Sequence, residues 1–125
     1  MNRILYRPIG CGELKLIEES TMKAFPPRLN WQPIFYPVLD LEYARQIARD
    51  WNTNDELSGY AGFVTCFEIS ETYFQQFEIH NVGGFNHNEL WVPAEELENF
   101  NKKIEGSIKV IDAFYGSQFE GEKRY

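Results

Sequence analysis

The stretch Gly83–Asn101, GGFNHNELWVPAEELENFN, predicts a turn, a short strand and a helix in close succession. The Gly-Gly pair that opens it predicts a tight turn or a close approach of two backbone segments, because glycine adopts unusual backbone angles at little cost. Leu90-Trp91-Val92 is a compact apolar run that is too short for a helix. Leu97 and Phe100 then recur three residues apart among acidic residues, as on a helix with one buried face.

Glu89 is the first candidate functional residue, because it places a carboxylate at the start of the apolar run. His87 lies two positions earlier, and residues two apart on an extended strand share a face. We therefore expect the two side chains to point the same way. A solvated strand edge is the structural alternative for this pair.

The composition is that of one folded domain. A chain of 125 residues is long enough for one core and too short for two. Hydrophobic residues make up 43% and charged residues 25%, which is ordinary for a globular chain and unlike a disordered one. Aromatic residues reach 16%, so they supply much of the burial and can also line a pocket. We expect residues 1–115 to form the domain and residues 116–125 a polar tail.

The charge limits the classes of partner. A formal net charge of −7 argues against a broad nucleic-acid surface and against an anionic membrane. There is no apolar run of about 18 residues and no hydrophobic segment typical of a signal peptide, so a cytoplasmic location is expected. The remaining partners are a small-molecule nucleotide or another protein.

Neither cysteine nor histidine spacing indicates a metal site. Cys11 and Cys66 are far apart and match no metal-binding spacing, and free thiols are expected. His80 and His87 lack a third ligand of metal type at a recognised spacing. We therefore expect no metal.

The first half of the chain predicts two strands and two helices. They are a strand at 4–6 with Arg7 at its end, a helix at 12–20, a strand at 34–36 and a helix at 41–52. Asp40 is the predicted N-cap of the second helix. The apolar face of this helix is expected to pack on a sheet that includes Val64 and Leu90, through Leu41, Ala44, Ile47, Ala48 and Trp51.

The segment 22–33 is expected to be irregular, because its prolines exclude a helix and a central strand. The second half then predicts a strand at 63–69, helical turns capped by Ser70, a strand at 77–82 and a last strand that ends at Tyr115. Strands and short helices mix without long regular alternation. This pattern favours the α+β class, with small mixed, mainly antiparallel sheets and short flanking helices.

The order of these elements and their polar residues resembles the ADP-ribosyltransferase-like superfamily. The likeness is to its small prokaryotic branches and to the related RNA 2′-phosphotransferases, and it spans residues 3–115. In that superfamily the first strand carries a His or Arg, a middle segment a Tyr or Ser, and a late strand a Glu. The resemblance implies a split β-sandwich, NAD as substrate, and a triad of Arg7, Tyr36 or Tyr43, and Glu89.

The chemistry of such a triad is coherent. Cleavage of the nicotinamide–ribose bond develops positive charge on the ribose, which the Glu89 carboxylate would stabilise. Tyr36 or Phe35 would sandwich the nicotinamide. Arg7, with Arg28 as a second candidate, would bind ribose or pyrophosphate oxygens. The residues implied to contact NAD are therefore Arg7, Arg28, Phe35, Tyr36, Tyr43 and His87.

Some alternatives stay open. Many transferases carry Glu or Gln two residues before the catalytic Glu, where this chain has His87, so the acceptor is not defined. In the structural alternatives, Arg7 pairs with an acid, Tyr36 belongs to the core and Glu89 protects a strand edge. The two main hypotheses are an NAD-dependent ADP-ribosyltransferase-like enzyme and a non-catalytic binding or interaction domain of the same fold. An unrelated small α+β domain with hydrolase chemistry is the third. The enzyme hypothesis predicts that Arg7, Tyr36 or Tyr43, and Glu89 line one concave site.

Overall fold

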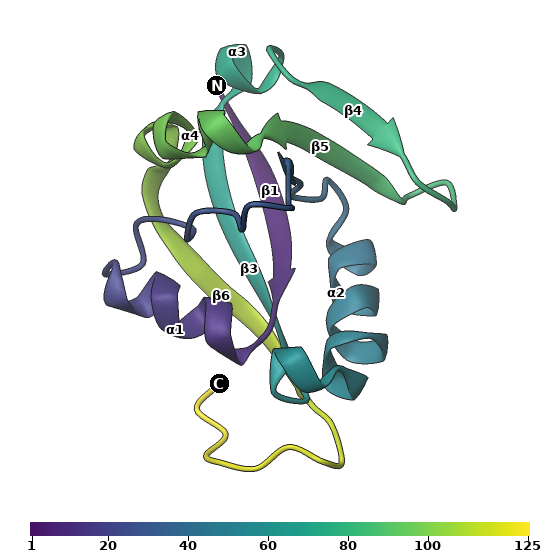
Figure 1. Cartoon of the computed structure of the whole chain (residues 1–125). Coiled ribbons are helices and arrows are strands. Elements are labelled where there is room, and N and C mark those ends of the chain that lie inside the picture. Colours follow the sequence, from purple (N-terminus) through teal and green to yellow (C-terminus); the bar gives the residue numbers. More distant parts are fainter.

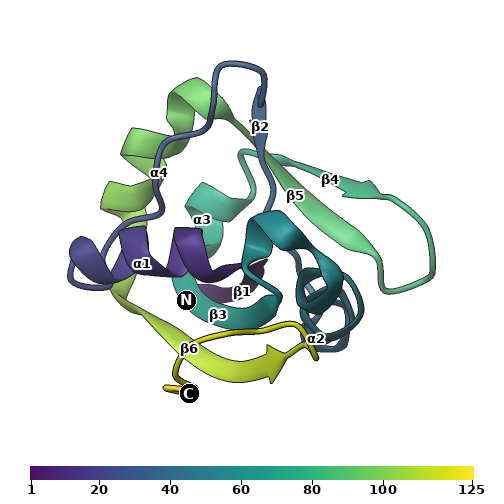
Figure 2. The same cartoon turned by 60° about the horizontal axis from the view of Figure 1, so that its bottom comes forward.

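The apolar runs of the sequence form two antiparallel sheets of three strands each (Figure 1). The computed structural model describes residues 1–125. The first sheet has the strand order β1 (Asn2–Ile9), β3 (Ala61–Ser70) and β6 (Glu105–Tyr115). The second has the order β2 (Ile34–Phe35), β5 (Asn88–Pro93) and β4 (Glu78–Asn81). Strands β4 and β5 form a hairpin that extends from the body of the molecule (Figures 1 and 2). The α+β class with small antiparallel sheets is confirmed.

One buried residue joins the two sheets. Val38 forms an isolated antiparallel bridge with Tyr6 of β1 and a second bridge with Glu89 of β5. Its N–H and C=O bond to the backbone of Tyr6 at 2.7 and 3.0 Å. The residues before and after Val38 bond to the residues that flank Glu89, at 2.8 and 3.1 Å. Strands β1 and β5 are therefore held on opposite sides of a single residue.

Helices cover both faces of the first sheet. The helices are α1 (Cys11–Glu19), α2 (Leu41–Asp50), α3 (Glu71–Phe74) and α4 (Leu97–Lys103), with 3₁₀ turns at 52–54, 56–58 and 94–96. The main core gathers α1, α4 and the second sheet against the sheet face that carries Leu5 and Phe67. A smaller core holds α2 against the opposite face, around Val64. No helix has the length and apolar character to cross a membrane.

Helix α2 lies directly on the backbone of β3. Its N-cap is Asp40, as predicted, since the carboxylate accepts a hydrogen bond from the N–H of Tyr43 at 2.9 Å. Ala44 and Ala48 are fully buried. A Cβ added to Gly62 of β3 would lie 2.3 Å from the carbonyl oxygen of Ala48. Small residues on both elements therefore set this close packing.

Three predictions about this helix are wrong. The helix ends at Asp50 instead of residue 52, and Trp51, expected on the buried face, is 59% exposed. The reason is that α2 packs on β3 through its alanines, and the larger side chain of Trp51 beyond them points outward. Leu90 does not lie under α2 either, because β5 belongs to the second sheet and Leu90 packs in the main core. Ile47 is half-buried and contacts the smaller core from its border.

The C-terminal segment 116–125 contains no helix or strand, and it turns back below the end of β6 towards α1 (Figure 1). Its last residues contact α1. The hydroxyl of Tyr125 and the guanidinium of Arg124 both donate to the Glu18 carboxylate, each at 2.8 Å. The arginine lowers the pKa of Glu18, so the contact is charged at neutral pH.

Gly62→Ala is expected to lower the free energy of unfolding by about 2–3 kcal/mol, because the new Cβ would collide with the backbone of α2. The matched control is Gly12→Ala in α1. Nothing lies within 4 Å of a Cβ at that position, so the change should raise stability by about 0.5–1 kcal/mol. Urea unfolding followed by circular dichroism measures both. Equal stability of the two variants would contradict the packing of α2 on β3.

Candidate functional site

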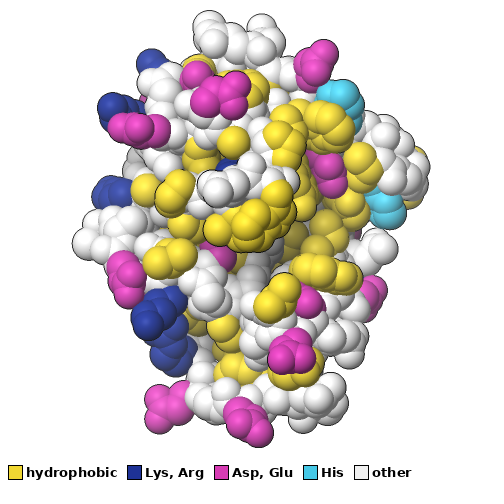
Figure 3. All heavy atoms as spheres, in the orientation of Figure 1, with side chains coloured by type: hydrophobic (Ala, Val, Ile, Leu, Met, Phe, Trp, Pro, Cys, Tyr) yellow, Lys and Arg dark blue, Asp and Glu magenta, His cyan; other side chains and the backbone are white.

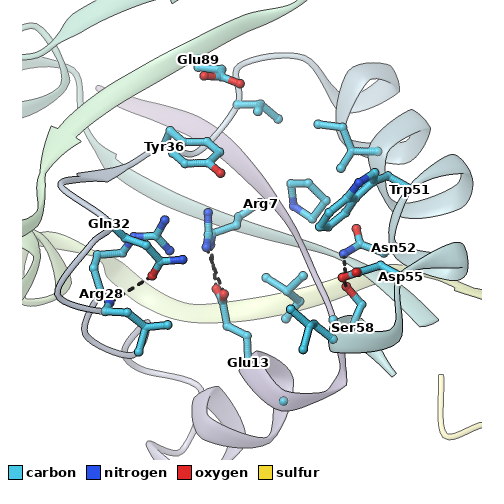
Figure 4. Close-up of a pocket in the computed structure, with 18 residues that line it drawn as sticks. Arg7, Glu13, Arg28, Gln32, Tyr36, Trp51, Asn52, Asp55, Ser58 and Glu89 are labelled. Atoms are coloured by element: carbon cyan, nitrogen blue, oxygen red, sulfur yellow. Dashed lines mark hydrogen bonds and ion pairs between the residues drawn. The ribbon is translucent and has the colours of Figure 1, made fainter. Parts of the chain in front are cut away.

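A cavity of about 660 Å³ opens where the two sheets diverge. Its volume is within the range of about 300–1,000 Å³ that is usual for small-molecule sites. One wall comes from the end of β1 and the start of α1, and another from the loop 28–36. The third comes from the end of α2 and the turns that follow, while Val38 and Glu89 close the remaining side (Figure 4). Figure 3 shows this hollowed face, with hydrophobic side chains around the opening.

The cavity brings together four of the predicted site residues, namely Arg7, Arg28, Tyr36 and Glu89. Their meeting follows from the bridge at Val38. Arg7 comes directly after the residue that pairs with Val38 on one side, and Glu89 is the residue that pairs with it on the other. Tyr36 precedes Val38 by two positions, and its hydroxyl points into the cavity in Figure 4. Tyr36 is 42% exposed, which excludes the core alternative.

Arg7 is nearly buried, with 7% of its surface exposed, and its charge is balanced by Glu13. The carboxylate of Glu13 accepts from Nε at 2.6 Å and from Nη2 at 3.0 Å, so the ion pair is bidentate. The guanidinium carbon also lies 4.8 Å from the centre of the Phe35 ring. Burial of an unpaired cation is costly, and Glu13 offsets that cost. Arg7 thus makes the ion pair of the structural alternative, and Nη1 is the nitrogen that this pair leaves free.

Arg28 adds a second guanidinium to the same wall. Its Nε donates to the carbonyl of Ile34 at 3.0 Å, and its guanidinium carbon lies 5.5 Å from the centre of the Tyr36 ring. It takes part in no salt bridge. Burial, and after it the nearby charge of Arg7, lowers the pKa of Arg28. An anion bound here would relieve this repulsion, so the wall favours phosphate or carboxylate groups.

Glu89 is held by two donors. Its carboxylate accepts from the indole N–H of Trp91 at 3.2 Å and from the hydroxyl of Tyr43 at 3.4 Å. Burial, and after it the charge of Glu89, raises the pKa of Tyr43, so this hydroxyl stays protonated at neutral pH. Glu89 lies on β5, the central strand of its sheet, which excludes the edge-protection alternative. The carboxylate is therefore oriented before any ligand arrives.

The other three predicted residues do not line the cavity. Phe35 is 1% exposed and packs against Phe25 and Phe100, so the prediction that it sandwiches a ligand is wrong. Tyr43 is also buried, beneath Glu89. Its ring stacks on that of His87, with centres 4.2 Å apart. Of the two tyrosines considered for the middle position, Tyr36 lines the cavity, whereas Tyr43 lies outside it and donates its hydroxyl to Glu89.

The role of His87 is in the hairpin turn. Its Nδ1 accepts from the N–H of Gly84 at 3.0 Å, and a Cβ on Gly83 would lie 2.7 Å from the same nitrogen. Gly83 thus permits a close approach of the backbone to a side chain, whereas a Cβ on Gly84 would meet the ring of His87 only at an ordinary contact distance of 3.5 Å. Neither glycine has a positive φ. His87 and Glu89 both contact Tyr43, which agrees with their expected common direction.

The wall opposite Arg28 was not predicted from the sequence. Asn52, Asp55 and Ser58 line it, and they are joined by hydrogen bonds. The Asn52 amide Nδ2 donates to the Ser58 hydroxyl at 2.9 Å, and that hydroxyl donates to Asp55 at 2.6 Å. A Cβ on Gly10 would lie 2.5 Å from the Cα of Ser58, so this turn abuts the β1–α1 connection. In the sequence, only the polar run NTNDELSG (residues 52–59) pointed to this region, and it did not show which segment the region would contact.

Nothing in the side-chain arrangement gathers metal ligands. No group of three or more His, Cys, Asp or Glu residues could hold a metal ion. Cys11 and Cys66 are free thiols, and burial raises the pKa of both.

Glu13→Gln is expected to lower the free energy of unfolding by about 2–3 kcal/mol, because it leaves the buried guanidinium of Arg7 without a counter-charge. The control is Asp50→Asn, which breaks the exposed pair with Arg49 and should leave stability nearly unchanged. Denaturant unfolding of both variants at pH 7 provides the measurement. A loss for Glu13→Gln no larger than for Asp50→Asn would show that the ion pair contributes nothing.

Comparisons of the chain with protein-family models, with curated proteins and with solved structures find no match. The function is therefore inferred from the geometry of the cavity and the chemistry of its side chains.

Proposed function

We propose that the cavity binds NAD and that the protein cleaves it, in the manner of ADP-ribosyltransferases, for transfer of ADP-ribose to an acceptor. The observation that carries the proposal is that Arg7, Tyr36 and Glu89 line one cavity, although they lie on three separate elements. These are the residues that the resemblance implies for the triad. The divergence of two antiparallel sheets at Val38 supports the finer assignment to a split β-sandwich of the ADP-ribosyltransferase-like type.

The two arginines that line the cavity, Arg7 and Arg28, suit the pyrophosphate of NAD. Arg28 is a guanidinium without a carboxylate partner, and Arg7 retains Nη1 for a ligand. Guanidinium groups bind pyrophosphate and ribose oxygens through paired N–H donors. Tyr36 lies against both guanidinium groups. The centre of its ring is 5.8 Å from the guanidinium carbon of Arg7 and 5.5 Å from that of Arg28. Its exposed ring is the surface on which the nicotinamide would lie.

Glu89 would act on the ribose. In the reaction the bond between the ribose C1′ and the nicotinamide nitrogen breaks, and its electron pair leaves with nicotinamide, which becomes neutral. Positive charge develops on the ribose, and a carboxylate that accepts from a ribose hydroxyl stabilises that charge. An acceptor or water then bonds to C1′ and loses a proton. The donors Trp91 and Tyr43 keep the Glu89 carboxylate in place, so little reorganisation is needed.

A non-catalytic nucleotide-binding domain is the second candidate. It is favoured by the internal pairing of the key charges, because Glu13 occupies two nitrogens of Arg7 and both oxygens of Glu89 have donors. Such a domain would bind NAD without cleaving it.

Glu89→Gln is expected to reduce nicotinamide release by about 10²–10³-fold, because it removes the negative charge that the transition state needs. Binding of NAD should change far less, since the charge on the ribose develops mainly in the transition state. The matched control is Glu68→Gln, an exposed residue of β3 outside the cavity, which should behave as wild type. Calorimetric titration with NAD and chromatographic detection of nicotinamide provide the two measurements.

The outcomes separate the candidates. Binding of NAD without release of nicotinamide would favour the non-catalytic domain. The absence of NAD binding at millimolar concentration would overturn both candidates. Release that is equally fast in wild type and Glu89→Gln would remove Glu89 from the chemistry.

A further inference from the structure

Gln32 presents a carboxamide to the cavity from the loop 28–36. The residue is half-buried, and its Oε1 accepts from the backbone N–H of Leu29 at 3.0 Å. The backbone N–H of Gln32 in turn donates to the carbonyl of Leu29 at 2.9 Å. These two hydrogen bonds close a short turn directly after Arg28. The side chain of Gln32 is therefore held in place beside the second guanidinium of this wall.

The bond to Leu29 fixes which end of the amide faces the cavity. A flip of the amide would bring its NH₂ group against the N–H of Leu29, and two donors repel each other. Oε1 therefore stays on the turn, and Nε2, which donates to no group of the protein, is left for a ligand. In Figure 4 this nitrogen points into the cavity. Gln32 thus offers a donor of fixed orientation.

The neighbouring side chains offer donors of the same kind. Arg28 has no carboxylate partner and keeps both terminal nitrogens, and Arg7 keeps Nη1. The carboxylate of Glu13 already accepts from Arg7 on both of its oxygens. The wall therefore presents N–H donors from three side chains. Such a wall favours an oxyanion, because each donor needs an acceptor and Arg28 carries an unbalanced positive charge.

We propose that Gln32 binds phosphate groups, and that its Nε2 forms with Arg28 and Nη1 of Arg7 the subsite for the pyrophosphate. The assignment deepens the proposed function and rests on it for the identity of the ligand. The donors favour pyrophosphate over a carboxylate, because a carboxylate has only about four acceptor positions and would leave some of these N–H groups unpaired. Gln32 also adds donors without adding to the repulsion between the two guanidinium groups, since its amide is neutral.

The test is calorimetric titration of the protein with inorganic pyrophosphate in a metal-free buffer. Gln32→Glu keeps the length of the side chain and an oxygen for the N–H of Leu29, but it replaces the Nε2 donor by a charged oxygen. It should weaken binding at least about tenfold, because a donor to an anion is lost and a negative charge is added in its place. Gln46→Glu on α2 is the control. It makes the same change of charge at an exposed position outside the cavity and should bind as wild type.

Two further measurements separate a ligand contact from a structural role of Gln32. In nuclear magnetic resonance spectra of wild type, the side-chain NH₂ signals of Gln32, assigned by their absence in Gln32→Glu, should shift when pyrophosphate is added. Those of Gln46 should not shift. Malonate, which joins two carboxylates in place of two phosphates, should bind at least about tenfold more weakly than pyrophosphate, because it has fewer acceptor positions.

The outcomes distinguish the subsite from the proposed reaction. No binding of pyrophosphate at millimolar concentration would overturn the subsite, and so would a loss in Gln32→Glu no larger than in Gln46→Glu. Unshifted signals of Gln32, or equal affinity for malonate, would overturn it as well. Pyrophosphate binding that depends on Gln32, in a protein that neither binds nor cleaves NAD, would leave the subsite standing and remove the proposed function. Nicotinamide release that depends on Glu89, with pyrophosphate affinity unchanged in Gln32→Glu, would do the reverse.

Discussion

The two-sided backbone pairing of Val38 is the constraint on which the rest of this structure depends. The segment between β2 and α2 runs between β1 and β5. There Val38 pairs with Tyr6 of β1 on one side and with Glu89 of β5 on the other. Each sheet has only three strands, and the second sheet packs together with α1 and α4 on one face of the first. Joined through Val38, they enclose the main core on one side and diverge on the other, and the cavity occupies the divergence. The position of the site is thus a consequence of the sheet topology.

Much of the local structure could be predicted because its causes are local. The N-caps at Asp40 and Ser70 accept the hydrogen bonds that their residue types favour, and the strands follow their β-favouring runs. Trp51 could not be predicted, because its spacing matches the buried face of α2. What places it outside is the contact of Gly62 with the helix backbone, which leaves room for alanine alone. A one-dimensional pattern contains no information about the size of the opposing surface.

The candidate site likewise contains some residues that could be predicted from the sequence and others that could not. Arg7, Tyr36 or Tyr43, and Glu89 could be proposed only through the resemblance, which assigns them by the order of the elements. Which of two adjacent aromatic residues faces the core could not be decided, and the structure buries Phe35 and exposes Tyr36. The network around Asn52 could not be found at all. It depends on a turn after α2 that meets the β1–α1 connection, and the two segments are distant in sequence.

The contact between Gly62 and α2 also sets the stiffness of the cavity. With no side chain between helix and strand, α2 cannot slide or tilt without backbone collision, so the wall that carries Trp51 and Asn52 is a fixed reference. The facing wall is the loop 28–36, which is anchored chiefly through Arg28 and the short strand β2. Any adjustment to a bound molecule therefore falls on the loop. The rate at which a ligand exchanges would then depend on that segment.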